Sequence, residues 1–281
     1  MRKRLVAALA VTAAALVAVT GARAVMFGQP DTGNQYPWVG LVTFYDEDGV
    51  YLWRCSASAI SPTVLLTAAH CTEPPAVSSQ VWFDQGPIPA GAYPLRPVED
   101  RPPCTGFTGW PCTGGAAFGT PIPHPDYDGF QTFPNTNDIG VVLLDTPVTL
   151  ASYAALAPVG TLDSLATRRG EQETTFTVVG YGLQSVVPRE SAERTRYFGT
   201  VSLVNLRSAL SSGFNLAHTG APGKGTGGSA TCFGDSGGPI LYDGQIVAVT
   251  SFGLNFVCMG PGFGYRTDLA HSYAWISGFL E

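Results

Sequence analysis

Short β-rich runs separated by turn residues constrain the fold of this chain more than any other feature. Val, Ile, Thr and aromatic residues fill these runs, and Gly, Pro, Asn and Asp interrupt them at short intervals. The runs cover residues 38–45, 58–67, 140–144, 174–180 and 245–252. Many short strands with turn signals between them are typical of an all-β barrel or sandwich. Helical spacing of apolar residues is convincing only over residues 271–280, which predicts a C-terminal helix.

The chain is long enough for one large domain or two small ones. It has 281 residues, of which 45% are hydrophobic and 13% are charged, so a full core can be buried. Residues 74–134 are rich in Pro and Gly, and we interpret them as surface loops. Residues 147–160 are low in charge and rich in Ala, and we expect the junction between two halves there.

The first 24 residues have the pattern of a secretory signal peptide. Arg2-Lys3-Arg4 forms a basic start, residues 5–19 are apolar, and Ala22-Arg23-Ala24 fits a small-x-small cleavage site. The alternative is a retained membrane anchor, but the apolar stretch is shorter than the roughly 20 residues that a membrane-spanning helix needs. We therefore expect a secreted protein without stable membrane association after signal cleavage.

Charge and cysteine content narrow the classes of partner. Without residues 1–24 the formal net charge is −10, which argues against nucleic acid as a partner. Six cysteines in an exported chain predict disulfides, although composition alone leaves fifteen pairings open. Zinc binding is the weaker alternative, because no C-x-x-C pair exists and the four histidines are scattered. The acidic turn at 46–48 could suggest calcium, but three acids at a hairpin tip are far more often a solvated turn. We predict no metal and no cofactor.

Three segments carry candidate catalytic residues. Gly234-Asp235-Ser236-Gly237-Gly238-Pro239 frames one serine with glycines, which let a substrate carbonyl approach main-chain N–H groups. A serine nucleophile needs a base, and the base needs an orienting group. His70 follows an apolar run, and Asp138 opens another. Taken singly, these residues read as a turn, a packed core histidine and the start of a strand. Taken together, they indicate a Ser-His-Asp triad.

The segments Thr67-Ala68-Ala69-His70-Cys71, Asn137-Asp138-Ile139 and Gly234–Pro239 resemble the trypsin/chymotrypsin-like secreted serine peptidases. The order His, Asp, Ser distinguishes that family from subtilisins and α/β-hydrolases. The resemblance implies two packed six-stranded antiparallel β-barrels and a C-terminal α-helix. We expect an N-terminal barrel at 25–155 with the His and Asp, and a C-terminal barrel at 156–281 with the Ser and the specificity pocket. The leader and the lack of an evident propeptide suggest a bacterial member.

The resemblance also implies a role for each residue. Ser236 would be the nucleophile, His70 the general base and Asp138 its orienting partner. The backbone N–H groups of Gly234 and Ser236 would form the oxyanion hole. Asp235 would pair with the α-ammonium of Val25, which we expect signal peptidase to expose directly. The alternative is that Val25 is simply a frayed terminus.

The same resemblance assigns a specificity pocket. Ala230 would lie at its base, where trypsins carry an aspartate, and its walls would be Ser251, Phe252, Gly253 and Gly262. Without a carboxylate the pocket would not favour Lys or Arg, whereas glycines leave room for a large apolar or aromatic group. The implied disulfides are Cys55–Cys71, Cys232–Cys258 and, as the remaining pair, Cys104–Cys112. His124-Pro125-Asp126-Tyr127 resembles a structural segment of the family, and we assign it no catalytic role.

The sequence therefore predicts a secreted, monomeric serine endopeptidase that acts on protein or peptide substrates. Two alternatives stay open. A catalytically silent homologue would use the two-barrel surface as a binding module. Ester cleavage would be a side activity, because acyl-enzyme chemistry permits it.

Overall fold

A computed structural model describes residues 25–88, 117–165, 174–220 and 228–280. The signal peptide predicted at 1–24 lies outside the described residues, and so do Cys104 and Cys112. No helix in these described ranges is both long and apolar enough to cross a membrane.

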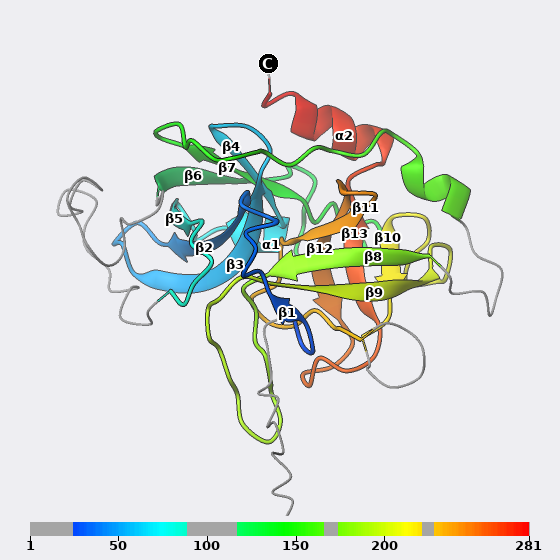
Figure 1. Ribbon diagram of the computed structural model, residues 1–281. Coiled ribbons are helices and arrows are strands. Elements are labelled where there is room, and N and C mark those ends of the chain that lie inside the picture. The colour runs from blue at the N-terminus through cyan, green and yellow to red at the C-terminus, as the bar shows by residue number, and fades with distance from the viewer. Residues whose placement is uncertain (1–24, 89–116, 166–173, 221–227, 281) are drawn as a thin grey trace, which may run out of the picture.

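Six strands from the first half of the chain close into an antiparallel barrel (Figure 1). Its strand order is β2-β3-β4-β7-β6-β5, and β2 pairs with both β3 and β5 to close the ring. Every residue of β2 is buried, because the strand lies between the apolar interior and neighbouring segments. The bounds are β2 Val39–Tyr45, β3 Tyr51–Ala59, β4 Val64–Thr67, β5 Ser78–Trp82, β6 Ala117–Pro123 and β7 Gly140–Leu144.

A second ring of six antiparallel strands follows in the order β8-β9-β10-β13-β12-β11. It is closed because β8 pairs with both β9 and β11. The short β1 (Gln29–Pro30) adds to β9 as a seventh strand. The bounds are β8 Thr175–Gly180, β9 Tyr197–Asn205, β10 Asn215–His218, β11 Pro239–Tyr242, β12 Gln245–Gly253 and β13 Gly262–Arg266. The predicted all-β fold of two six-stranded barrels is thereby confirmed.

The described helices are short. They are α1 Ala69–Thr72, the 3-10 helix η3 Thr161–Leu165 and the C-terminal α2 Ala270–Ser277. The predicted C-terminal helix is confirmed, although it ends three residues before the predicted limit, because Gly278 caps it by donating to the Ala274 carbonyl. α2 contacts the segment that follows β6 of the first barrel. Trp275 contacts His124 with ring centroids 4.8 Å apart, and Ile276 is fully buried.

Two expectations about the strands were wrong. The run 58–67 is two strands, since β3 ends at Ala59 and a turn at 60–63 leads into β4; the Ile60 N–H donates to the Val64 carbonyl across this turn. Residues 74–134 are not all loops, because β5 and β6 lie among them. β6 contains Pro121 and Pro123, which cannot donate ladder hydrogen bonds, yet it pairs with β7 over its last five residues. Tertiary pairing has outweighed local propensity there.

A buried ion pair connects the barrels. Arg196, just before β9, donates to Asp31 at 2.8 Å, and both side chains are fully buried. The same guanidinium donates to the backbone carbonyls of Val39 and Phe83 in the first barrel, at 3.1 and 3.0 Å. Arg196 thus ties the N-terminal segment and both barrels together. The strands of the two rings fall before Asp145 and after Thr174, while the domain limit at 155/156 stays a prediction.

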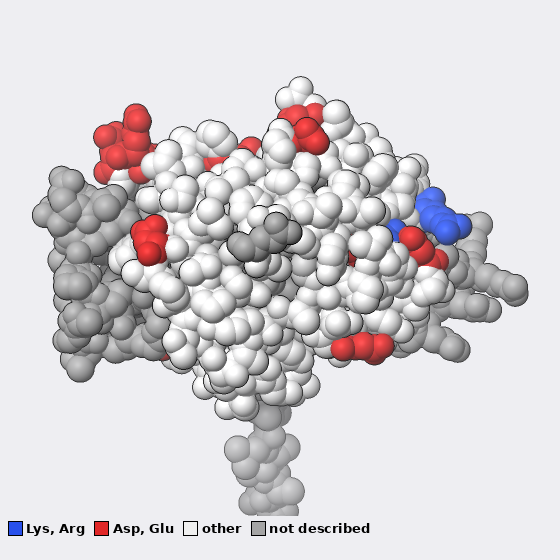
Figure 2. Space-filling view, turned by 90° about the horizontal axis from the view of Figure 1, so that it is seen from above, with Lys and Arg blue, Asp and Glu red and all other residues white. Residues whose placement is uncertain are grey.

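The exterior is acidic. On the face seen in Figure 2, Asp and Glu side chains form several separate patches, while Lys and Arg gather at one edge. This distribution agrees with the net charge of −6 for the full sequence.

Candidate active site

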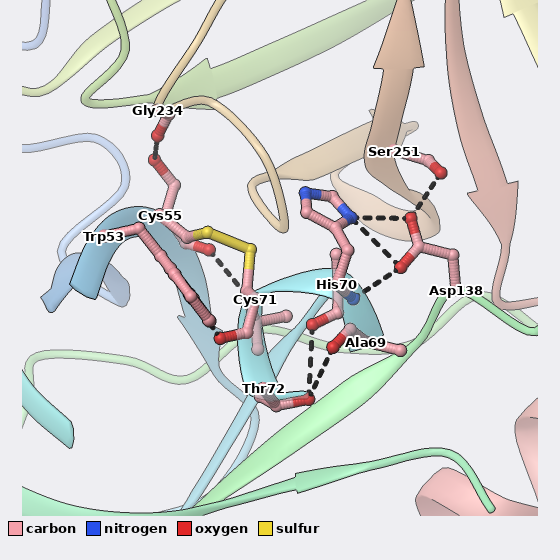
Figure 3. Close-up of a disulfide and its surroundings, with 12 residues drawn as sticks. Trp53, Cys55, Ala69, His70, Cys71, Thr72, Asp138, Gly234 and Ser251 are labelled. Carbon is pink, nitrogen blue, oxygen red and sulfur yellow. Dashed lines mark hydrogen bonds and ion pairs between the residues drawn. A yellow bond between two sulfur atoms is a disulfide. The ribbon is translucent and has the colours of Figure 1, made fainter. Parts of the chain in front are cut away.

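His70 lies on α1, directly after β4, and the surrounding contacts hold this helical turn against β3. The Cys55–Cys71 disulfide joins the two elements, and the indole N–H of Trp53 donates to the Cys71 carbonyl at 2.8 Å (Figure 3). Thr67 at the end of β4 donates its hydroxyl to the Ser56 carbonyl at 2.9 Å. The imidazole is therefore presented from a rigid support.

Asp138 meets the imidazole from the other side. Its fully buried carboxylate accepts hydrogen bonds from the His70 backbone N–H at 2.9 Å and from the Ser251 hydroxyl at 2.5 Å. The Nδ1 atom of His70 lies 2.9 and 3.1 Å from the two carboxylate oxygens. Figure 3 shows His70 between the disulfide and Asp138, with Ser251 beyond the carboxylate. Since a carboxylate accepts, Nδ1 carries the proton and Nε2 keeps a lone pair.

Burial and charge act in opposite directions on this pair. Burial alone lowers the pKa of His70, but attraction to Asp138 and the hydrogen bond outweigh it, so the pKa is raised. Burial raises the pKa of Asp138, but His70 and the hydrogen bonds from His70 and Ser251 lower it overall. Each residue thus favours the charged form of the other, which is what a base that must accept a proton requires.

Ser236 lies on a tight loop held by the first barrel. Gly234 and Gly237 on either side have positive φ angles of 94° and 74°. A Cβ atom on Gly237 would lie 1.9 Å from Thr67 Oγ1, so glycine is required there. Ser56 of β3 donates its N–H to the Ser236 carbonyl and its hydroxyl to the Gly234 carbonyl, both at 2.8 Å. The loop position is therefore set by contacts across both barrels.

Ser236 and His70 line the same cavity. Within the described residues their side chains do not hydrogen-bond, and such bonds often form only in the substrate complex. The N–H groups of Gly234 and Ser236 donate to no other described residue, which leaves both available to an anionic oxygen.

Asp235 is a buried carboxylate beneath this loop. It accepts hydrogen bonds from the backbone N–H groups of Gly182 and Cys232, at 2.8 and 2.9 Å. No described cation lies within ion-pair distance. Burial raises its pKa to about 7, although the two hydrogen bonds and the more distant Arg54 oppose the rise. Asp235 thus lacks the charged partner that a buried carboxylate needs.

The segment at Val25 runs beside the chain that leads into the loop. Val25 is fully buried rather than frayed, and the next residue, Met26, accepts a hydrogen bond at 3.0 Å from the Ala230 N–H. No ion pair joins Val25 to Asp235 in the described part of the chain. An α-ammonium exists at Val25 only once the peptide bond before it has been cleaved.

A cavity of about 620 Å³ opens beside the catalytic candidates. Four of the five predicted pocket residues line it: Ser251, Phe252, Gly253 and Gly262. Ala230 does not; it is buried against Met26, Leu183 and Cys232, and its neighbour Thr231 lines the cavity instead. Neighbouring residues of an extended segment point to opposite sides, and the hydrogen bond to Met26 turns Ala230 inward.

Several lining residues were not assigned to the site from the sequence, among them Tyr127, which was interpreted as part of a structural segment. Glu73, Tyr127 and Phe130 lie at the His70 side of the cavity. The Phe130 ring centroid is 6.2 Å from that of His70, 5.7 Å from that of Tyr127 and 5.9 Å from that of Phe252. The one available signal was that Glu73 follows His70 by three residues. Nothing in the sequence links Phe130 to the site.

Two disulfides fall within the described residues, Cys55–Cys71 and Cys232–Cys258. They are the pairings that the resemblance implied. The second lies at the wall of the cavity, where Cys232 and Cys258 are both lining residues.

Comparison with known proteins gives consistent matches. The family model described as Trypsin matches residues 116–276, more than half of the chain. Brachyurin of Leptuca pugilator is 30% identical over 225 residues, which cover 80% of this chain and 87% of that protein. CLIP domain-containing serine protease B4 of Anopheles gambiae is 24% identical, covering 90% of this chain and 69% of its own length.

Solved structures share the fold. HL collagenase superposes with a TM-score of 0.63 at 18% identity, covering 91% of this chain and 98% of the other. Human heparin binding protein gives a TM-score of 0.58 at 23% identity, with 91% and 96% covered. The relatives named among the curated sequences are arthropod and snake proteins, which give no support to a bacterial origin.

Proposed function

Because the chain belongs to the trypsin family of serine endopeptidases, which act on protein or peptide substrates, we propose that Ser236, His70 and Asp138 hydrolyse peptide bonds. The observation that carries the proposal is the hydrogen-bonded His70–Asp138 pair, which opens on the same cavity as Ser236. A silent homologue is not favoured, because all three residues are present.

The chemistry proceeds through an acyl-enzyme. Ser236 Oγ attacks the peptide carbonyl carbon while His70 Nε2 takes the hydroxyl proton, and the N–H groups of Gly234 and Ser236 stabilise the resulting oxyanion. The C–N bond then breaks and His70 gives its proton to the leaving amine. Water next attacks the ester, His70 takes a proton from it, and the proton returns to Ser236 as the acid leaves. Asp138 stays ionised throughout.

The side chain before the cleaved bond is proposed to be large and apolar or aromatic. Thr231 lies beside Gly262 in the cavity lining, and among the described lining residues Glu73, near His70, is the one that carries a carboxylate. A cation placed beside Thr231 and Gly262 would be buried without a partner, which is costly. The Phe252 ring, stacked on Phe263 with centroids 4.6 Å apart, offers an apolar wall.

We also propose a secreted monomer that signal peptidase activates by exposing Val25. The N-terminal pattern and the disulfides support export. The closed barrels support a monomer, because closure leaves few free strand edges for pairing with another copy. The buried, unpaired Asp235 supports a partner that appears on cleavage.

Labelling tests the proposal directly. Secreted protein would be treated with a fluorophosphonate, and its intact mass and N-terminal sequence would be measured, with Ser236→Ala as control. We expect one adduct on Ser236 in a chain that starts at Val25. No adduct despite that start would contradict the assigned catalysis. Peptides that differ only before the cleaved bond test specificity, and a preference for Arg or Lys there would contradict the apolar assignment.

A further inference from the structure

Glu73 is a carboxylate that lines the active-site cavity and has no role in the proposed catalysis. It caps the C-terminal end of α1, three residues after His70, and is half-buried. None of the ion pairs in the described chain involves it. Among the described lining residues it is the one carboxylate, and no Lys or Arg lines the cavity beside it. A negative charge in the lining of a binding site, without an ion-pair partner in the described chain, is available to a ligand.

The surroundings of Glu73 are aromatic. Tyr127 and Phe130 line the same side of the cavity, with ring centroids 5.7 Å apart and the ring planes nearly perpendicular, at 83°. Phe130 also lies 6.2 Å from the His70 ring. Aromatic faces carry partial negative charge, so they attract cations in addition to offering apolar contact.

Electrostatic coupling agrees with this placement. Glu73 is among the groups that raise the pKa of His70 and of Tyr127. Burial raises the pKa of Glu73 itself, His70 lowers it and Asp138 raises it. The carboxylate is therefore partly dehydrated and close to the reacting histidine, while His70 is already held by Asp138.

We propose that Glu73, Tyr127 and Phe130 form a subsite for a Lys or Arg side chain of the peptide substrate. The cation would belong to a residue within two positions of the cleaved bond, since Glu73 lies beside the histidine that handles the leaving group. The aliphatic part of the side chain packs on the rings and the charged end reaches the carboxylate. This inference rests on the proposed function and adds a second determinant to the apolar pocket.

Kinetics with a positional peptide set tests the subsite. The peptides carry Tyr directly before the cleaved bond, and Lys, Arg, Gln or norleucine is placed in turn at the residue preceding that Tyr and at each of the two residues after the bond. We expect one position at which Lys and Arg raise kcat/KM about tenfold over Gln, mainly through KM and less at high salt. Glu73→Gln should abolish this ratio. Asp145→Asn, which removes the same charge from an exposed turn outside the cavity, should keep it.

Two results would overturn the subsite: no cation preference at any position, or a preference that survives in Glu73→Gln. A protein that cleaves none of the peptides would refute the proposed function instead. In that case the peptides would be labelled with a fluorophore, and their binding to Ser236→Ala, with and without Glu73→Gln, decides the inference separately. Tighter binding of the Lys peptide that depends on Glu73 supports the subsite, and equal binding of all peptides rejects it.

Discussion

The buried Asp235 carboxylate should make the stability of the unprocessed chain fall as pH rises. Its pKa is about 7 in the folded chain, against an ordinary value of 3.8, because burial penalises the charged form. Between these two values the folded state holds a proton that the unfolded state has lost, so the free energy of unfolding decreases with increasing pH. The contribution is fully present below about pH 4 and is lost as pH passes about 7.

The size of the effect follows from the two pKa values. Their difference corresponds to about 4 kcal/mol of lost stability at high pH, a large share of the 5–15 kcal/mol typical of folded proteins. Urea unfolding followed by tryptophan fluorescence at pH 4.5 and 8.0 would measure it, in a chain with a short neutral extension before Val25. The same measurement on Asp235→Asn in the extended chain serves as the reference, because all other titrating groups contribute equally to both proteins. Relative to the wild-type chain, the variant should gain free energy of unfolding between pH 4.5 and pH 8.0.

Cleavage that exposes the α-ammonium of Val25 should reverse the effect of Asp235→Asn on stability at pH 8.0. Removing one partner of a buried ion pair destabilises the folded protein by roughly 3–5 kcal/mol, because the other charge is left buried without a partner. In a chain that starts at Val25, Asp235→Asn should therefore lower stability at pH 8.0 and abolish labelling of Ser236. Parallel pH dependence in the extended wild-type and variant chains would refute the burial argument. If Asp235→Asn in the chain that starts at Val25 kept the stability and the Ser236 labelling of the wild type, the proposed pairing of Asp235 with the Val25 α-ammonium would be refuted.

Three other substitutions have clear expectations. Asp138→Asn should reduce kcat by about 10⁴. It should also move the acidic limb of the pH–kcat/KM profile to lower pH, because the raised pKa of His70 depends on that carboxylate. An acidic limb at the same pH would contradict the role assigned to Asp138. Arg196→Met leaves the buried Asp31 unpaired and should cost roughly 3–5 kcal/mol in urea unfolding, whereas a loss below about 1 kcal/mol would show that water enters the site. Gly237→Ala should eliminate Ser236 labelling, since no room exists for its Cβ; normal labelling would show that the loop can shift.

The sequence predicted the parts of the site whose chemistry is local. His70, Asp138 and Ser236 lie in three short segments that together indicate a triad, and the structure brings His70 and Ser236 to one cavity with Asp138 behind the imidazole. Residues whose role depends on distant packing were not predictable. Phe130 lies in a loop and has a positive φ angle of 67°, which no local sequence pattern indicates.

The strands likewise include some that the local sequence predicted and some that depend on distant packing. Strands with continuous apolar residues, such as β7, were predicted at the right place. β6 was missed because its prolines argue against a strand, and only its position between β5 and β7 makes the pairing favourable. The inward direction of Ala230 likewise depends on a hydrogen bond to Met26, two hundred residues earlier in the chain.

Ser56 gives the nucleophile loop a foundation in the other barrel. Its N–H and hydroxyl hold the Ser236 and Gly234 carbonyls, and its hydroxyl accepts the Tyr181 N–H at 2.9 Å. A hinge motion that separated the barrels would break all three bonds and dismantle the oxyanion donors. Substrate must therefore enter without separation of the barrels, and a chimaera that joins halves of two relatives would need a small hydroxyl residue at position 56 to keep its nucleophile in register.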